Sequence, residues 1–285
     1  MSRRRDIQKH RRSLDEIHDI MNSMKNLSYM ETRKINDFLD VQHSVVRHIE
    51  TVAADFLSFY PDTLAEPAGS AVEVHLLIGA ERGFCGDFNH ALLRRFEAIT
   101  ATRTLDKLHL ICIGHRLQML LQNDEREIIA IDGASVAEEV GKVLNQIVNQ
   151  LSALQRRYVS LKVYAHYQND EHQFIEQQLL PPFQHLLYHQ QEEPHEPVLN
   201  LEPRKFLLEL SYHYLFVVLY EILYTSLMAE NRQRMEHLES AVRHMDEQSE
   251  ELQRQENILR QEEIIEEIEV ILLSTVSFDE QPFTG

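Results

Sequence analysis

Two long stretches without glycine or proline constrain this chain more than any other feature. The first runs from the N-terminus to Phe59, and the second runs from Arg204 to about Phe278. Glycine and proline are the residues that most often end helices, so each stretch predicts one uninterrupted helix. The first helix would be roughly 75–80 Å long at a rise of 1.5 Å per residue. No compact domain of this size needs an element of that length.

Apolar residues in both stretches follow a heptad pattern. In the first stretch they recur in alternating steps of three and four from Ile7 to Val52. A seam of two positions in seven is typical of a coiled coil rather than of a helix inside a globular core. The second stretch has a similar seam from Met228 to Leu259. It follows a segment, Phe206–Leu227, that is apolar nearly all round and should be packed on several sides.

The simplest arrangement of these helices is an antiparallel two-stranded coiled coil in which both helices leave the same globular base. Because the C-terminal helix is longer, about its last fifteen residues should extend past the N-terminal helix. An exposed apolar helix end implies a docking partner. The apolar stripe of this end comprises Ile264, Ile265, Ile268, Ile271, Leu272 and Thr275.

Between the helices the period of the sequence changes from helical to alternating strand and helix. The predicted strands are Val72–Ile78, Lys107–Ile113, a short one at Glu127–Ile131, and Leu161–Tyr167. The predicted helices are Asn89–Thr100, His115–Gln122 and Ser135–Arg156. This alternation predicts a small α/β layer domain with a mainly parallel sheet. We therefore expect an α/β fold with long helices, divided into coiled-coil helix 1–59, α/β domain 70–190 and coiled-coil helix 204–278.

The balance of charge limits the partners of the chain. Its formal net charge is −18 at pH 7. Nucleic acids and anionic lipids select Lys and Arg, so we expect neither as a partner. One basic run opens the chain, and we interpret it as a solvated helix face. It contains Arg3, Arg4, Arg5, Lys9, Arg11 and Arg12.

The sequence contains no segment that predicts membrane insertion or secretion. A membrane helix needs about 20 apolar residues, whereas Leu215–Leu227 is shorter and contains Glu221. The N-terminus is charged throughout its first sixteen residues, unlike a secretory signal. We expect a protein that faces the cytoplasm and does not itself enter the bilayer.

Cysteine and histidine form no recognisable metal or redox motif. Cys85 and Cys112 are too few for a disulfide framework, and we interpret them as small apolar residues of a reducing compartment. The sixteen histidines are scattered without the spacing of a metal site. We expect no metal ion, no cofactor and no catalytic residue.

Five ordered segments resemble the γ subunit of F-type ATP synthases, over essentially the whole chain. The first, Asp6–Met24, is similar to the family's opening E-I-R-x-K-I-x-S-I at Ile7, Ser13, Leu14, Ile20 and Met24. The second, Gly79–Leu92, is similar to S-x-D-R-G-L-C-G-G-L-N at Arg82, Gly83, Cys85, Gly86 and Asn89.

Three further segments continue the resemblance in the same order. Glu202 and Pro203 stand where the family has E-P-D before its last helix, and Ser226–Ala241 is similar to S-x-x-x-E-N/H-x-x-R-M. Arg260–Ile271 is similar to R-Q-x-x-I-T-Q-E-L-x-E-I. The chain departs from the family in its acidity, and Ile265 replaces a threonine. We identify it as a divergent acidic member, and leave open whether it is of the alternative, sodium-coupled type.

The resemblance implies a rotating central stalk that has no active site. Its partners would be the α and β subunits of the catalytic ring, an ε-type subunit and a membrane c-type ring. The implied contacts with β are Met24, Arg260, Gln261 and Glu267. The implied bearing tip comprises Ile264, Ile268, Ile271 and Leu272, and Glu202 would face the membrane ring. Without the resemblance, Arg260 would be a solvated residue paired with Glu256 or Glu263.

Two other functions stay open at this point. A homodimeric coiled-coil scaffold or regulator with an α/β domain would have the same pattern of elements. A nucleotide-binding enzyme would need a phosphate loop between Glu81 and Gly86, where the spacing of known phosphate motifs is missing and Glu81 and Asp87 would repel an anion. We interpret this loop as a tight turn whose glycines permit close packing.

Overall fold

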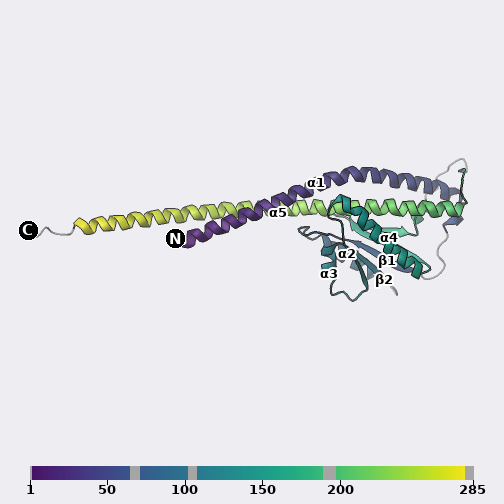
Figure 1. Cartoon of the computed structure of the whole chain (residues 1–285), viewed down its shortest axis with the longest axis horizontal. Coiled ribbons are helices and arrows are strands. Elements are labelled where there is room, and N and C mark those ends of the chain that lie inside the picture. The colour runs from purple at the N-terminus through teal and green to yellow at the C-terminus, as the bar shows by residue number, and fades with distance from the viewer. Residues whose placement is uncertain (1, 65–70, 102–107, 189–196, 280–285) are drawn as a thin grey trace, which may run out of the picture. The chain divides into compact units, whose positions relative to one another are not determined.

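The computed structural model describes residues 2–64, 71–101, 108–188 and 197–279 (Figure 1). The chain forms two compact units. The helical unit comprises Met1–Asn26 and Glu236–Gly285, and the sheet unit comprises Leu27–Met235. Two long helices, α1 (Ser2–Phe59) and α5 (Pro203–Asp279), each contribute to both units. The division into segments 1–59, 70–190 and 204–278 stays a prediction.

A five-stranded sheet forms the centre of the sheet unit, with the strand order β3-β2-β1-β4-β5. The first four strands are parallel, whereas β5 is antiparallel to β4. The predicted mainly parallel sheet is thus confirmed. The strands are β1 (Val72–Ile78), β2 (Leu108–Ile113), β3 (Ile128–Ile131), β4 (Leu161–Gln168) and β5 (Phe174–Leu180).

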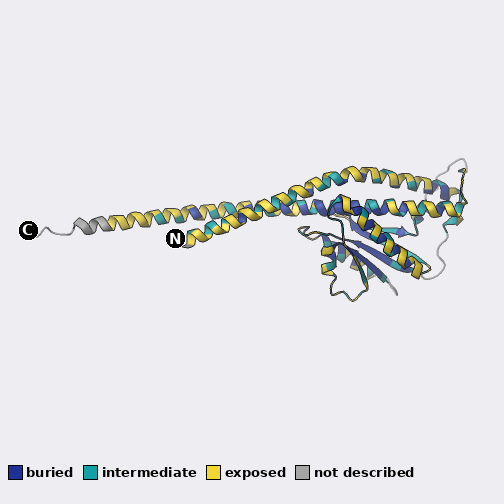
Figure 2. Cartoon of the chain, in the orientation of Figure 1, coloured by how far each residue is buried: buried dark blue, intermediate teal, exposed yellow. Residues whose placement is uncertain are grey.

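Helices cover both faces of this sheet (Figure 1). One face carries Val74, Leu76 and Ile78 of β1 and packs against α4 (Val140–Arg157) and α5. The other face, with Leu77, packs against α2 (Phe88–Thr100) and α3 (His115–Leu120). Successive strand residues point to opposite faces, which explains why strands buried on both sides are apolar almost throughout. Figure 2 shows the strands as the most deeply buried part of the sheet unit.

Within the sheet unit, α1 runs antiparallel to α5. Phe38 stacks on Tyr224 with ring centroids 5.6 Å apart, and the Tyr214 hydroxyl donates to Glu50 over 3.1 Å. From the first contact to the second, the residue number increases along α1 and decreases along α5. The buried residues of α1 in this unit are Ser28, Ile35, Leu39, Val46, Ala53, Ala54, Phe56 and Leu57.

The helical unit repeats the antiparallel pairing with a smaller apolar core. Leu14 of α1 packs against Val242 and Met245 of α5. Arg4 donates to Glu263 over 3.0 Å, and Arg11 donates to Glu256 over 2.9 Å. The predicted antiparallel helix pair is therefore confirmed within each unit. The basic run is only partly a solvated face, because Arg4 and Arg11 are half-buried ion-pair partners.

The seam of α1 is narrower than the predicted one. Phe38, Val45 and Val52 belong to the predicted seam, yet they are 38–45% exposed. The buried positions Ser28 and Ile35 are seven residues apart, and the next buried position follows only four residues later, at Leu39. A step of four in a heptad pattern rotates the seam around the helix, so one of the two predicted stripes faces solvent. The α5 seam from Met228 to Leu259 has no exposed member.

Two elements of the sheet unit differ from their predictions. Strand β5 was not predicted, because its sequence FIEQQLL has no regular alternation, as suits a half-buried edge strand. The helix predicted from Ser135 begins with a 3₁₀ turn at Ala137–Glu139, and α4 follows from Val140.

On length and composition alone, the described part of α5 contains a segment that could cross a membrane. In the folded chain 39% of this window is buried, and the core helix of a soluble protein passes the same test. The buried positions Val218, Leu219 and Ile222 pack in the core of the sheet unit. Packing in the core of the sheet unit thus accounts for these buried apolar positions.

Two glycines let the ends of β1 and β2 approach each other. Gly114 has a φ of 104°, a region that favours glycine, and a Cβ there would lie 2.6 Å from the carbonyl oxygen of Gly79. At Gly79 itself a Cβ would lie 2.6 Å from the Cβ of Leu117. Close backbone packing is therefore found at Gly79 and Gly114, whereas the prediction concerned the glycines between Glu81 and Gly86.

Gly114→Ala should lower the free energy of unfolding by about 2–3 kcal/mol, because it combines a disfavoured φ with a backbone clash. Gly141→Ala is the matched control: it lies in α4, and its Cβ would meet only the Tyr220 hydroxyl at 3.2 Å. We expect the control to change stability by less than about 1 kcal/mol. Urea unfolding followed by circular dichroism measures both. Equal effects would contradict the role of Gly114.

Candidate functional site

The structure brings together two of the segments that carry the family resemblance. The loop after β1, with Glu81, Arg82 and Gly83, lies against α5 at Glu230 and Arg234. We call this contact the loop–helix joint. It lies wholly within the sheet unit.

A buried carboxylate forms the centre of the loop–helix joint. Glu230 accepts hydrogen bonds from the backbone N–H groups of Glu81, at 3.2 Å, and Arg82, at 3.3 Å. Arg234 pairs with Glu230 one helical turn away and donates from its Nε to the Gly83 carbonyl over 3.0 Å. A further Arg234 N–H donates to the Asn231 side chain over 2.7 Å. The side chains of Glu230 and Arg234 are 4% and 5% exposed, so each needs these partners.

The opposite side of the loop is held by a second carboxylate. Glu81 accepts hydrogen bonds from the backbone N–H groups of His115, at 2.8 Å, and Gly133, at 2.7 Å. The Asn89 side chain accepts another from the N–H of Ala80 over 2.9 Å. The loop is therefore tied to α2, α3, the segment after β3, and α5.

The electrostatics of the joint are dominated by burial. Burial raises the pKa of Glu230, although Arg234 and the two loop amides oppose this rise. Burial also raises the pKa of Cys85 to about 12, with a further contribution from the Glu230 charge. A thiol with such a pKa is not a nucleophile near neutral pH.

The joint also occupies two of the loop's backbone N–H groups. Phosphate loops present free backbone N–H groups to an anion. Here the N–H groups of Glu81 and Arg82 already bind an anion, the carboxylate of Glu230. The loop is a structural turn, as the sequence predicted.

The residues predicted to contact β lie in the helical unit. Met24 on α1 is half-buried, whereas Arg260, Gln261 and Glu267 on α5 are exposed. The apolar tip is also exposed, by 46–69% (Figure 2). Its described members are Ile264, Ile265, Ile268, Val270, Ile271, Leu272 and Leu273, and the side chain of Thr275 lies outside the described residues.

Two expectations about single residues need comment. Glu256 pairs with Arg4 and Arg11 of α1, and Glu263 pairs with Arg4. If Arg260 were only a solvated residue, we expected it to pair with one of these two carboxylates. Glu202 is exposed directly before α5, where its carbonyl accepts the N–H of Phe206 over 2.9 Å.

Glu230 and Arg234 belong to the family segment Ser226–Ala241, but the sequence alone did not predict a role for them. The available signal was a Glu–Arg pair at i, i+4 shortly after the apolar segment Phe206–Leu227. The cross-helix role of Arg4 and Arg11 was missed because charge pairing between distant segments leaves no local pattern.

These features define a class of protein. The chain is a structural subunit built on an antiparallel helix pair, with a small α/β sheet fixed to one of the helices. In the loop–helix joint, the buried charges of Glu230 and Arg234 are paired with each other and hydrogen-bonded to the β1–α2 loop.

Comparisons with known proteins agree with this class. The sequence model of a family described as ATP synthase matches residues 3–275. The chain therefore belongs to this family, and within it to the γ subunits, which are non-catalytic. Comparison with curated proteins finds no match.

Solved structures share the fold. A chain of the Euglena gracilis mitochondrial ATP synthase, OSCP/F1/c-ring, in rotational state 3 has a TM-score of 0.62 and 14% identity, covering 99% of this chain and 98% of that one. A chain of the rotor of the same enzyme in rotational state 1 has a TM-score of 0.58 and 13% identity, covering 92% of this chain and 99% of that one. A chain of the central stalk/c-ring structure of the Tetrahymena thermophila mitochondrial ATP synthase has a TM-score of 0.54 and 17% identity, covering 78% of this chain and 99% of that one.

Arg234→Ala should destabilise the chain by about 3–5 kcal/mol, because it leaves the Glu230 carboxylate buried without its cation. Arg232→Ala is the matched control on the same helix. Arg232 pairs with Asp170 at the surface over 2.8 Å, and its loss should cost less than about 1 kcal/mol. Thermal unfolding compares the two. Similar melting temperatures for both variants would show that the joint contributes little.

Both thiols should be inert in the folded chain. Burial raises the pKa of Cys85 and of Cys112 to about 12, so at pH 8 only about one thiol in ten thousand would be ionised. We expect no alkylation by iodoacetamide within an hour at pH 8, and alkylation of both cysteines in denaturant. Mass spectrometry counts the adducts. Rapid alkylation of the native chain at Cys85 would argue against a closed joint.

Proposed function

We propose that this chain is the rotating central-stalk subunit of an ATP synthase complex. In this role it couples ion flow through a membrane ring to ATP synthesis or hydrolysis on catalytic β subunits. The observation that carries the proposal is the family match over residues 3–275, on a chain that has the antiparallel α1–α5 pair of ATP synthase rotors.

Coupling requires that the rotor contact the conformational states of β with different free energies. The helical unit offers such asymmetry in its charges. Arg3, Arg5, Lys9 and Arg12 are exposed on α1, whereas the exposed charges near the C-terminal end of α5 are mostly acidic. Those acidic residues are Glu262, Glu266, Glu267 and Glu269. As the stalk turns, each β subunit would meet first one sign of charge and then the other.

Torque must also pass between the sheet and the helices. The loop–helix joint supports this step, because it links α5 to the β1–α2 loop through buried hydrogen bonds rather than through a flexible linker. Buried and mutually satisfied polar groups are rigid, since moving one leaves others without partners. We infer that the joint lets the sheet and α5 turn as one body.

The contacts with other subunits are proposals for individual residues. The residues that would contact β are Met24, Arg260, Gln261 and Glu267. Arg260 and Glu267 are exposed, so their charged groups can form hydrogen bonds with a partner subunit. The apolar tip with Ile264, Ile268, Ile271 and Leu272 would turn in an apolar bearing of the α–β ring. Glu202 would lie near the c-type ring, and an ε-type subunit would bind the sheet unit.

The chain is part of the ATP synthase complex. Its expected place is the cytoplasmic face of the membrane, held there by its partners and not by insertion of its own helices. Burial of the most apolar part of α5 in the sheet unit supports attachment through partners.

Reconstitution tests the proposal. The chain is mixed with its cognate α and β subunits, and ATP hydrolysis is compared with that of α and β alone. We expect the chain to join them in one complex and to stimulate hydrolysis. Failure to stimulate would reject the central-stalk function. Recovery of the chain only as a stable homodimer would favour a coiled-coil scaffold instead.

The double variant Arg260→Ala, Gln261→Ala should lower the stimulated hydrolysis about tenfold, the effect of losing about 1.4 kcal/mol of contact free energy with β. Arg254→Ala is the matched control, since Arg254 is exposed on the same helix and only approaches Glu250 and Glu251 of its own helix, at 3.7–3.8 Å. We expect the control to keep the normal rate. Equal rates for the double variant and the control would remove Arg260 and Gln261 from the interface.

A further inference from the structure

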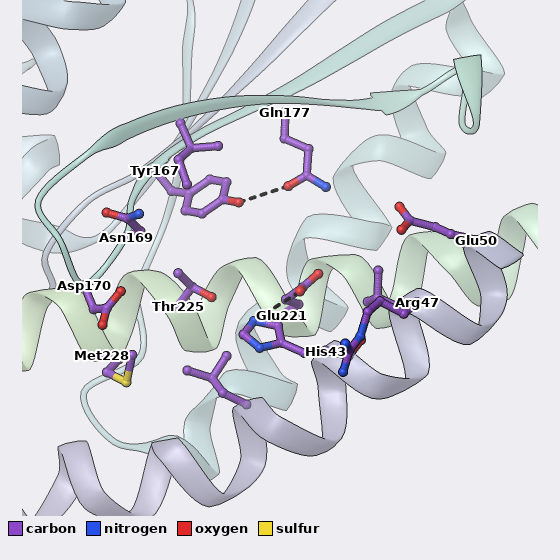
Figure 3. Close-up of a pocket in the computed structure, with 13 residues that line it drawn as sticks. His43, Arg47, Glu50, Tyr167, Asn169, Asp170, Gln177, Glu221, Thr225 and Met228 are labelled. Carbon is purple, nitrogen blue, oxygen red and sulfur yellow. Dashed lines mark hydrogen bonds and ion pairs between the residues drawn. The ribbon is translucent and has the colours of Figure 1, made fainter. Parts of the chain in front are cut away.

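A groove runs between the β4–β5 hairpin, α5 and α1 in the sheet unit (Figure 3). Its main part has a volume of about 630 Å³, within the range of sites that hold a ligand or a peptide segment. Tyr167 and Gln177 of the hairpin project toward α5, and the Tyr167 hydroxyl donates to Gln177 over 3.0 Å (Figure 3). His43 of α1 reaches Glu221 of α5 over 3.2 Å and closes the other side. The apolar part of the lining comprises Leu39, Val46, Ile175 and Met228.

A second cavity of about 310 Å³ extends the groove along β5. It shares Glu50 and Gln177 with the first cavity. Its lining includes the consecutive residues Glu176, Gln177 and Gln178. Side chains of consecutive strand residues point to opposite faces of a sheet, so a cavity that touches all three lies along the edge of the strand. The second cavity therefore follows the edge of β5, whereas the main part of the groove lies over the sheet face that carries Ile175 and Gln177.

Strand β5 is an edge strand with few of the features that protect such strands from pairing. It is last in the strand order, and among the described strands only β4 pairs with it. Its sequence contains neither lysine nor proline, and its irregularity in register lies at the Val163 end of β4, so Phe174 to Gln178 stay in continuous register. An edge of this kind is a template for a further strand.

The charges around the groove select the strand that could bind. The two cavities are lined by four carboxylates, those of Glu50, Asp170, Glu176 and Glu221, by Arg47 and by two histidines. His43 pairs with Glu221 and His185 with Glu50, and Arg232 pairs with Asp170 from outside the cavities. Burial raises the pKa of Glu221, so this carboxyl gains from a cation placed nearby. The excess of negative charge favours a segment that carries lysine or arginine.

We propose that the groove binds an extended, basic segment of another subunit, which adds a strand to the outer edge of β5. Its backbone would hydrogen-bond with β5, its apolar side chains would enter the pocket near Ile175 and Met228, and its basic side chains would approach Glu221 and Glu176. An extended strand uses the edge of β5, which a docked helix would not. A second copy of this acidic chain would bring like charges together. The proposal takes from the proposed function only the source of the segment.

Photo-crosslinking in the assembled complex tests the proposal. Gln177 and Gln178 are replaced, one at a time, by p-benzoylphenylalanine, and the crosslinked peptides are identified by mass spectrometry. Because these two residues point to opposite faces of β5, a paired strand should be crosslinked at positions one or two residues apart in one basic peptide. Gln155, exposed on α4, is the matched control and should not reach that peptide.

The charge of the groove is then varied while the probe stays at position 178. Gln177→Lys should reduce the crosslink about tenfold, and Gln177→Glu should keep or increase it. Gln177→Met removes the hydrogen bond with Tyr167 without adding charge, so it separates loss of packing from repulsion. Melting temperatures verify that all three variants are folded.

Several results would overturn the proposal. These are crosslinks spaced three or four residues apart, as on a helix, crosslinks to a second copy of this chain, equal yields for the Lys and Glu variants, and no crosslink in a complex that hydrolyses ATP normally. ATP hydrolysis is measured on the same samples. A failure of the groove in an active complex is thereby distinguished from a failure of the central-stalk function.

Discussion

The sheet unit depends on a carboxylate that lies where solvent cannot reach it. Glu230 belongs to α5, yet two of its hydrogen-bond donors are backbone N–H groups of the β1–α2 loop. An isolated buried charge would be costly, so the loop, Arg234 and the helix are stable only together. Glu81 extends the same logic to the turns after β2 and β3. The sheet and the long helix thus form one packed body rather than two elements in chance contact.

The long helices and the parallel strands were predictable because their signals are local. Absence of breakers predicted α1 and α5 to within one or two residues of their ends, and short, largely apolar runs followed by glycine predicted β1 and β2. Strand β5 was not predictable in this way, since an edge strand that is half-exposed has no strong pattern. The shift of the α1 seam at Ile35 was not predictable either, because it becomes visible only when α1 is packed against its partner helix.

The site was less predictable than the fold, for the same physical reason. The sequence identified both halves of the loop–helix joint as family segments, but it gave no reason for them to meet. Glu230 and the Gly83 loop are separated by about 150 residues, so only the tertiary structure brings them together. The contacts proposed for Met24, Arg260 and Gln261 are harder still to predict from this sequence, because their partners belong to other chains.

The antiparallel pairing of the two ends has a consequence for synthesis of the chain. Arg4 and its partner Glu263 are 259 positions apart in the sequence. At about 5–20 residues per second, a ribosome would need roughly 13–50 seconds between making the first and the second. During that time the apolar seam of α1 has no α5 to cover it, and an uncovered seam can pair with other nascent chains. The last helix therefore completes a surface that the first helix exposes while the rest of the chain is being made.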